Sequence, residues 1–245
     1  AITDVAGNPF SGIFGNATWN FTTFAPQTVA SISAVGCVGD DINITGQFLT
    51  GITTVRFNGS GGNVNASSFT IVNDNLITAT VPFYSAPISS LSGTIFLQKT
   101  GGGNPVTDLV TTETIEIGPS QANLTVGTID NDPVCSSGTV VSSTIKVDVR
   151  GGTGPYVVDY GISSVSNYNS GDDITANPNA AGPNVFSPVS VTDANGCQVP
   201  IGQLSGSYTV TQNIRSVVEA GGIGGSIDWC PAADGLTIEL NTSDL

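Results

Sequence analysis

The sequence predicts an all-β protein built as a series of β-sandwiches, and three observations lead to this fold class. Thr, Val, Ile, Ser and Asn dominate the chain, and β-branched residues suit a half-buried pleated surface. Glycine and proline number 31 and 13 and supply turns, whereas Met is absent and Lys and Arg total five, so good helix formers are scarce. Polar and apolar residues also alternate with period two between breaks spaced 8–12 residues apart.

The alternation identifies strands in chain order. It is visible at 41–45, 144–149 and 207–211, where every second residue is apolar, and at 111–117, which ends in Ile-Glu-Ile. The best candidate for a helix, residues 85–91, reads better as a loop. We therefore expect no substantial helix.

Composition and charge exclude several function classes. Five cations face nineteen anions, for a net charge of −14, which argues against a nucleic-acid partner because phosphate binding needs clustered Lys and Arg. Without His, the chain has no Ser-His-Asp triad and no His-ligated zinc. No apolar run reaches the length of a membrane span. The glutamates Glu113, Glu116, Glu219 and Glu239 single out no catalytic pair, so we expect no enzyme activity.

Residues 1–25 predict two strands that do not make a whole domain. The pattern ITDVAGNPF followed by ATWNFTT resembles the closing hairpin of SbsA-type bacterial immunoglobulin-like (Ig-like) domains. Two strands alone are marginal in water. Trp19, Phe21 and Phe24 therefore need a sheet to pack on, in this chain or in another.

Residues 28–118 predict one sandwich. The runs GDDINITGQF, VRFNG and ITATVP resemble the pattern of IPT/TIG domains, an Ig-like family. We expect a strand bend or bulge at Gly46, core positions for Phe48 and Phe57, and a tight turn at Asn58–Gly59. Residues 99–105 predict a hairpin tip.

Residues 120–218 predict a second sandwich. GGTGPY at 151–156 and TDANGC at 192–197 resemble elements of the SprB-type repeats of gliding-bacterium adhesins. By that resemblance Cys135 pairs with Cys197. Cys37 and Cys230 then remain, to pair with each other or with other subunits. An even number of cysteines without zinc or redox spacing favours disulfides and an oxidising compartment.

Residues 219–245 predict a Gly-rich hinge at 221–225 and a terminal strand at 236–240 that carries Ile238 and Leu240. Strands without a domain at both ends allow two interpretations. The chain is a segment whose flanking domains complete the ends, or it is a polymer subunit that donates an end strand to its neighbour.

Clustered Asp and Asn offer the only cofactor candidate, a Ca²⁺ site at Asp130, Asn131 and Asp132. The alternative is turn residues that bond their own backbone. The same choice holds for Asp40–Asp41, Asp172–Asp173 and Asp193 with Asn195, where Asp193 to Gly196 favours a turn.

These observations predict a non-catalytic structural protein of the bacterial exterior, a subunit or segment of an extracellular filament or surface adhesin. Its partners are then other copies of itself, flanking domains, or a glycan or surface receptor. The alternative is a spacer or carbohydrate-binding accessory module of a large secreted enzyme. Tyr156, Tyr160, Tyr168 and Trp229 are candidates for a sugar platform; we expect Tyr156 and Trp229 in the core and Tyr168 exposed.

Overall fold

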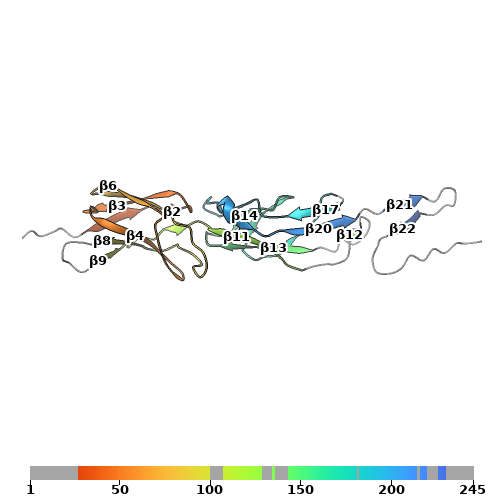
Figure 1. The fold of residues 1–245 in the computed structure, drawn as a ribbon, viewed down its shortest axis with the longest axis horizontal. Coiled ribbons are helices and arrows are strands. Elements are labelled where there is room, and N and C mark those ends of the chain that lie inside the picture. Colours follow the sequence, from red (N-terminus) through yellow and green to blue (C-terminus); the bar gives the residue numbers. More distant parts are fainter. Residues whose placement is uncertain are drawn as a thin grey trace, which may run out of the picture.

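The computed structural model describes residues 27–99, 107–128, 134–135, 143–180, 182–213, 216–219 and 226–229. Within these ranges the regular structure is β, apart from one short 3₁₀ turn, η1 (Ile201–Gln203). Two sandwiches follow one another along the long axis (Figure 1). This confirms the fold class of tandem Ig-like β-sandwiches. In the described part of the chain, no helix has the length and apolar character needed to cross a membrane.

The first sandwich consists of two four-stranded sheets. One has the strand order β1-β3-β7-β6 and the other β5-β4-β8-β9. A short parallel pair, β10-β2, lies at the end next to the second sandwich (Figure 1). The strands are β1 (Thr28–Ile32), β2 (Val35–Gly36), β3 (Asp41–Gln47), β4 (Ile52–Gly59), β5 (Gly62–Asn65), β6 (Phe69–Asn73), β7 (Leu76–Thr80), β8 (Ile95–Lys99), β9 (Thr107–Val110) and β10 (Glu116–Ile117).

The core of the first sandwich follows directly from the alternation in the sequence. In β3, Ile42 and Ile44 are buried, whereas Asp41 and Asn43 are exposed. Most other core residues are aliphatic side chains from the two facing sheets, joined by Phe57 and Tyr84. Period two places them on one face because successive side chains point to opposite faces of a sheet.

The second sandwich combines two long ladders, β11 with β13 and β17 with β20, with several ladders of only two or three residue pairs. Its sheets have the orders β16-β13-β11-β19, β15-β14-β18 and β12-β20-β17. The strands are β11 (Gln121–Val126), β12 (Val134–Cys135), β13 (Thr144–Arg150), β14 (Tyr156–Asp159), β15 (Ser164–Tyr168), β16 (Ile174–Thr175), β17 (Gly182–Phe186), β18 (Ser190–Thr192), β19 (Leu204–Ser205) and β20 (Tyr208–Asn213). Three tyrosines, Tyr156, Tyr160 and Tyr168, lie in its core beside Phe186 and aliphatic residues.

Two local expectations in the first sandwich are wrong. Phe48 is 43% exposed, because its backbone takes a left-handed conformation (φ 59°) that turns the ring outward, and Leu49 fills the core instead. The tight turn lies after Gly59, which pairs with Gly62, so Gly61 carries the positive φ. Gly59 instead approaches the backbone of Ser90.

The expected strand at 111–117 is interrupted. β9 ends at Val110, the chain bends, and pairing resumes with an isolated antiparallel bridge between Ile115 and Gly93 and then with β10. The Thr111 hydroxyl donates to the carbonyl of Glu113 at 2.8 Å and accepts from the amide of Ile95 at 3.0 Å. This local bond competes with ladder pairing and causes the break.

Beyond the second sandwich, β21 (Ser216–Glu219) and β22 (Ser226–Trp229) form an antiparallel pair. The Gly-rich run 221–225 therefore connects two paired strands. The predicted assembly residues Trp19, Phe21, Phe24, Ile238 and Leu240 lie outside the described residues.

Candidate functional site

The candidate site is the junction between the two sandwiches, which combines a buried connection, a disulfide and side-chain hydrogen bonds. Three residues, Gly118, Pro119 and Ser120, connect β10 to β11, and all three are buried. The amide of Gly118 donates to the carbonyl of Gly36, and the amide of Ser120 donates to the carbonyl of Arg150, each at 2.9 Å. This connection is therefore fixed to both sandwiches.

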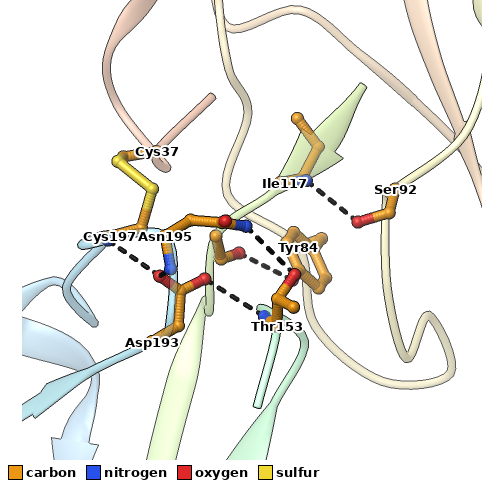
Figure 2. The surroundings of a disulfide bond; sticks show 9 residues. Cys37, Tyr84, Ser92, Ile117, Thr153, Asp193, Asn195 and Cys197 are labelled. Carbon is orange, nitrogen blue, oxygen red and sulfur yellow. Dashed lines mark hydrogen bonds between the residues drawn. A yellow bond between two sulfur atoms is a disulfide. The ribbon is translucent and has the colours of Figure 1, made fainter. Parts of the chain in front are cut away.

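A disulfide between Cys37 and Cys197 joins the two sandwiches covalently (Figure 2). The Cα atoms lie 5.1 Å apart, within the range a disulfide requires, although the two residues are 160 positions apart in sequence. The disulfide lies directly on the connection. A Cβ atom at Gly118 would lie 2.5 Å from the Cβ and 2.9 Å from the Sγ of Cys197, so only glycine fits there.

The expected Cys135–Cys197 pair is wrong, and so is a pairing of Cys37 with Cys230 or with another subunit. Cys135 lies in β12, which pairs with β20 at Asn213. This is the end of the second sandwich away from the junction (Figure 1). Cys197 faces the first sandwich instead, where Cys37 follows β2.

Asp193 positions Cys197 for the disulfide. One carboxylate oxygen, Oδ1, accepts from the amides of Asn195 and Cys197 at 3.0 and 2.8 Å. The other, Oδ2, accepts from the amide of Thr153 at 3.1 Å. Asp193 is thus a buried turn residue, as the TDANGC motif predicted, and it also links this motif to GGTGPY (Figure 2).

The Gly151–Gly152 turn packs against the first sandwich. Gly151 has φ +70°, and a side chain there would collide with the hydroxyl of Tyr84. That hydroxyl donates to the carbonyl of Gly118 at 2.9 Å (Figure 2). Burial raises the pKa of Tyr84 to about 12, against a smaller lowering from the Ser120 hydroxyl.

Arg150 and Thr153 add polar contacts across the junction. Nη1 of Arg150 donates across the junction to the carbonyl of Ile88 at 2.9 Å, and Nε donates within the second sandwich to Oε1 of Gln121 at 3.1 Å. The Thr153 hydroxyl donates to Oε2 of Glu116 at 3.4 Å. The two sandwiches are therefore held by side chains on more than one side of the connection.

A polar groove of about 440 Å³ opens beside these contacts. Ser89 contributes from the first sandwich, and the rest of its polar lining comes from the second. These residues are Gln121, Asn123, Asp148, Arg150 and Ser205.

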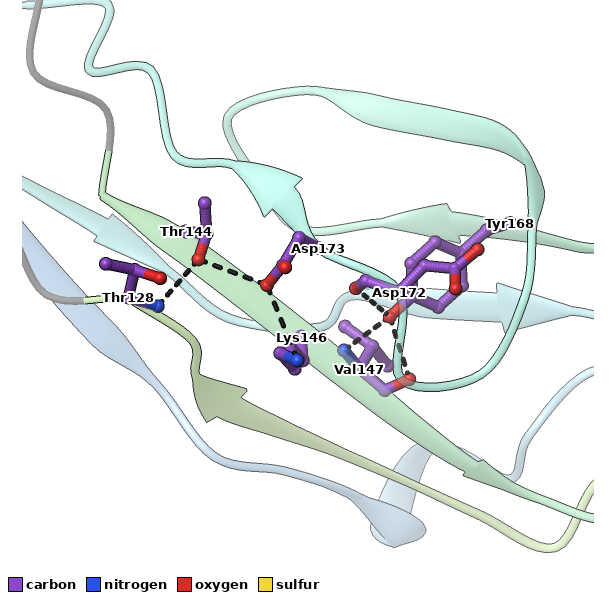
Figure 3. Close-up of polar contacts among 7 residues, drawn as sticks. All are labelled: Thr128, Thr144, Lys146, Val147, Tyr168, Asp172 and Asp173. Atoms are coloured by element: carbon purple, nitrogen blue, oxygen red, sulfur yellow. Dashed lines mark hydrogen bonds and ion pairs between the residues drawn. The ribbon is translucent and has the colours of Figure 1, made fainter.

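The acidic pairs do not assemble a cation site in the described part of the chain, where no group of three His, Cys, Asp or Glu residues gathers. Asp172 and Asp173 point to different partners (Figure 3). Asp172 accepts from Nδ2 of Asn169, whereas Asp173 accepts from Thr144 and forms a 3.6 Å ion pair with Lys146. Asp130, Asn131 and Asp132 lie outside the described residues, so Ca²⁺ binding there stays a prediction.

The expected exposure of Tyr168 is wrong, because this residue is only 3% exposed. Its hydroxyl oxygen accepts from the amide of Val147 at 2.8 Å, and its proton faces the carbonyls of Val147 (3.1 Å) and Asp172 (2.8 Å) (Figure 3). Tyr156 is buried, as predicted, and its hydroxyl donates to the carbonyl of Gly151. Tyr160 is buried too, whereas Trp229 belongs to β22, whose side chains are not described.

The sequence therefore identified the two motifs that the second sandwich contributes to the junction. The motifs GGTGPY and TDANGC meet at the junction, where the amide of Ala194 donates to the carbonyl of Thr153. Sequence reasoning missed Tyr84, Gly118 and the partner of Cys37. The available signal was Cys37 itself, a cysteine beside a predicted strand of the first sandwich.

No protein-family model matches the chain. No curated protein matches it either. Similar solved structures include a chain crystallised with a xylogluco-oligosaccharide (13% identity, TM-score 0.35, covering 78% of this chain and 42% of that one). Another is the set of fibronectin(III)-like modules of Clostridium thermocellum CbhA (11% identity, TM-score 0.31, covering 77% of this chain and 95% of that one).

A third is SGBP-B of the Bacteroides ovatus mixed-linkage glucan utilization locus, in complex with a mixed-linkage heptasaccharide (14% identity, TM-score 0.27, covering 78% of this chain and 46% of that one). The chain thus spans less than half the length of the first and third of these proteins. Similarities at this level concern the fold alone.

Proposed function

We propose that this chain is a stiff, non-catalytic structural module of the bacterial exterior, a subunit or segment of an extracellular filament or surface adhesin. The observation that carries the proposal is the junction, where a disulfide, a buried three-residue connection and side-chain hydrogen bonds join two Ig-like sandwiches. Tandem domains move relative to each other by default unless their interface is extensive. A covalently closed junction suits a protein whose task is to hold a length and a direction.

The same disulfide supports a location outside the cytoplasm. Disulfides persist in oxidising environments, which include the bacterial periplasm and cell exterior. The acidic composition, with a net charge of −14, favours solubility of repeated modules at high local density. The resemblance of residues 28–118 to IPT/TIG domains and of 120–218 to SprB-type repeats supports a surface location.

Self-assembly is tested on the full chain purified without reductant. Negative-stain electron microscopy is expected to show filaments with a repeat near the length of two sandwiches, and removal of 1–25 or of 230–245 is expected to abolish them. A truncated chain that assembles as well as the intact one contradicts strand donation. Separate two-domain particles from the intact chain contradict the polymer and leave a segment of a longer protein.

The groove at the junction favours a second candidate, a carbohydrate-binding accessory module. Amide, carboxylate, guanidinium and hydroxyl groups line it, and such groups bond sugar hydroxyls. It does not use Tyr168, which is buried. Titration calorimetry with plant and microbial polysaccharide fragments tests this function, with Asn123→Ala as the groove variant and the exposed Thr53→Ala, on another part of the first sandwich, as control. Binding that Asn123→Ala leaves unchanged contradicts a groove site.

A further inference from the structure

The Cys37–Cys197 disulfide lies on the shortest covalent path between the two outer ends of the tandem. From the outer end, the chain passes through β1 and β2 to Cys37, and from Cys197 it leaves through η1, β19 and β20. β2 lies at the junction, whereas β20 and β12 extend toward the far end of the second sandwich (Figure 1). The path therefore follows the long axis of the molecule.

We infer that the disulfide is a mechanical tie, which carries tension between the two ends of the tandem and bypasses residues 38–196. A tensile force divides among covalent paths according to their slack. The direct path crosses the junction in a single disulfide with a Cα–Cα distance of 5.1 Å. The alternative path contains 160 residue steps and runs through strands of both sandwiches, so it stays slack while the disulfide is closed.

The bypassed segment contains most of the strands of both sandwiches. β3 to β9 of the first sandwich and β11 to β18 of the second lie inside it. The connection Gly118–Ser120 also lies inside it, so the two sandwiches cannot be pulled apart at their linker. A force that would otherwise extend a domain therefore does not pull on the strands that supply most of either core, although Val199 and Val210 of the second core lie on the loaded path.

The strands that remain under load are held in a resistant geometry. β1 is paired with β3 from Thr28 to Ile32, and β20 lies between β12 and β17. Both strands are pulled from opposite ends, one end being the outer chain and the other the disulfide. The ladders of β1 with β3 and of β20 with β17 are antiparallel, so their hydrogen bonds lie perpendicular to the strand and this tension loads several of them together.

The surroundings of the disulfide protect the tie. Cys197 is fully buried, and its amide is held by the Asp193 carboxylate. Gly118 packs directly on its sulfur. The tie is therefore part of the packed junction.

This inference deepens the proposed structural role and rests on it for its biological meaning. Its test uses single molecules in solution and needs no filament. A failure of assembly therefore counts against the polymer alone, and a failure of the mechanical test counts against the tie alone.

The experiment stretches the full chain between protein tags fused to both ends, coupled without thiol chemistry, in a single-molecule force instrument. The matched pair is Cys135→Ser/Cys230→Ser, which keeps only the tie, and the variant in which Cys37→Ser and Cys197→Ser are added. The second variant is expected to release about 550 Å more contour length, since each residue contributes up to about 3.3–3.6 Å. Equal release from both variants overturns the inference.

A second measurement tests the tie without the variant that lacks Cys37 and Cys197, and so does not depend on the folding of that variant. The Cys135→Ser/Cys230→Ser chain is held at constant force after its outer strands have yielded, and dithiothreitol is added. Dithiothreitol reduces the Cys37–Cys197 disulfide to two thiols and is itself oxidised to a cyclic disulfide. The bypassed segment is then free to extend. One added gain of about 550 Å supports the tie, and a chain already fully extended before reduction contradicts it.

Discussion

The two sandwiches fill their interiors in different ways. The first has two regular four-stranded sheets around a mainly aliphatic core, with Ile44, Ile77 and Leu97 among its fully buried residues. The second has three sheets in which most ladders have only two or three residue pairs, and tyrosines occupy much of its core. Its tyrosine hydroxyls bond backbone groups where ladder pairing stops, as Tyr168 does at Val147 and Tyr156 does at Gly151.

The difference shows how an irregular sheet avoids stranded polar groups. A buried amide or carbonyl without a partner is costly, so backbone released from a ladder must find another group. In the second sandwich tyrosine supplies both apolar bulk and that partner. The first sandwich has less need of this because each ladder in its two main sheets has four or five residue pairs.

The largest expected effect comes from separating the two sandwiches. The chain-entropy relation gives about 5 kcal/mol for a disulfide that closes a loop of this length. Adding Cys37→Ser and Cys197→Ser to a Cys135→Ser/Cys230→Ser background should lower stability by about this amount in guanidinium unfolding. The fluorescence and circular dichroism transitions should then separate as the sandwiches unfold individually. Unchanged midpoints would show that the noncovalent junction alone holds them.

Core truncation compares the two interiors directly. Phe57 and Phe186 are both fully buried, one in each sandwich. Replacement of either by Ala should cost about 3–5 kcal/mol through lost burial and a residual cavity. If the sandwiches unfold separately, each variant shifts one transition in calorimetry and leaves the other in place. A shift of both transitions by either variant would mean that the junction makes them one cooperative unit.

Tyr168→Phe tests the role of tyrosine in the second sandwich. The variant keeps the ring but removes the partner of the Val147 amide, which should cost about 1–3 kcal/mol in urea unfolding. Tyr208→Phe is the matched control, since the Tyr208 hydroxyl makes a 3.5 Å contact with Ser143. Equal losses in the two variants would contradict a special role for the Tyr168 hydroxyl.

The smallest expected effect is a change in folding stability at alkaline pH, which comes from the buried tyrosine hydroxyls. Burial raises the pKa of Tyr84 to about 12 from an ordinary value of 10, and it also raises the pKa values of Tyr156 and Tyr168. Between pH 10 and 12 the unfolded chain loses phenol protons before the folded one does, so stability should fall as pH rises. Thermal unfolding across this range measures the slope, and Tyr84→Phe should flatten it. An identical slope in the variant would mean that Tyr84 ionises alike in both states.

The sequence by itself determined the all-β class and much of the strand pattern. Alternation placed β3 and β13 correctly because side chains in a strand change face at every residue, a rule that needs no knowledge of the partner strand. The sequence also identified the motifs GGTGPY and TDANGC of the second sandwich, and both take part in the junction.

Only the tertiary structure decided which residues meet. Phe48 follows the alternation of β3, yet a left-handed backbone at the strand end turns it outward. Tyr168 lies in a polar run of sequence, yet its ring is buried because its hydroxyl finds backbone partners across the sandwich. The partner of Cys197 depended on how two separately folded sandwiches dock. A disulfide requires two Cα atoms within a few ångströms, and no local pattern specifies that distance between residues 160 positions apart.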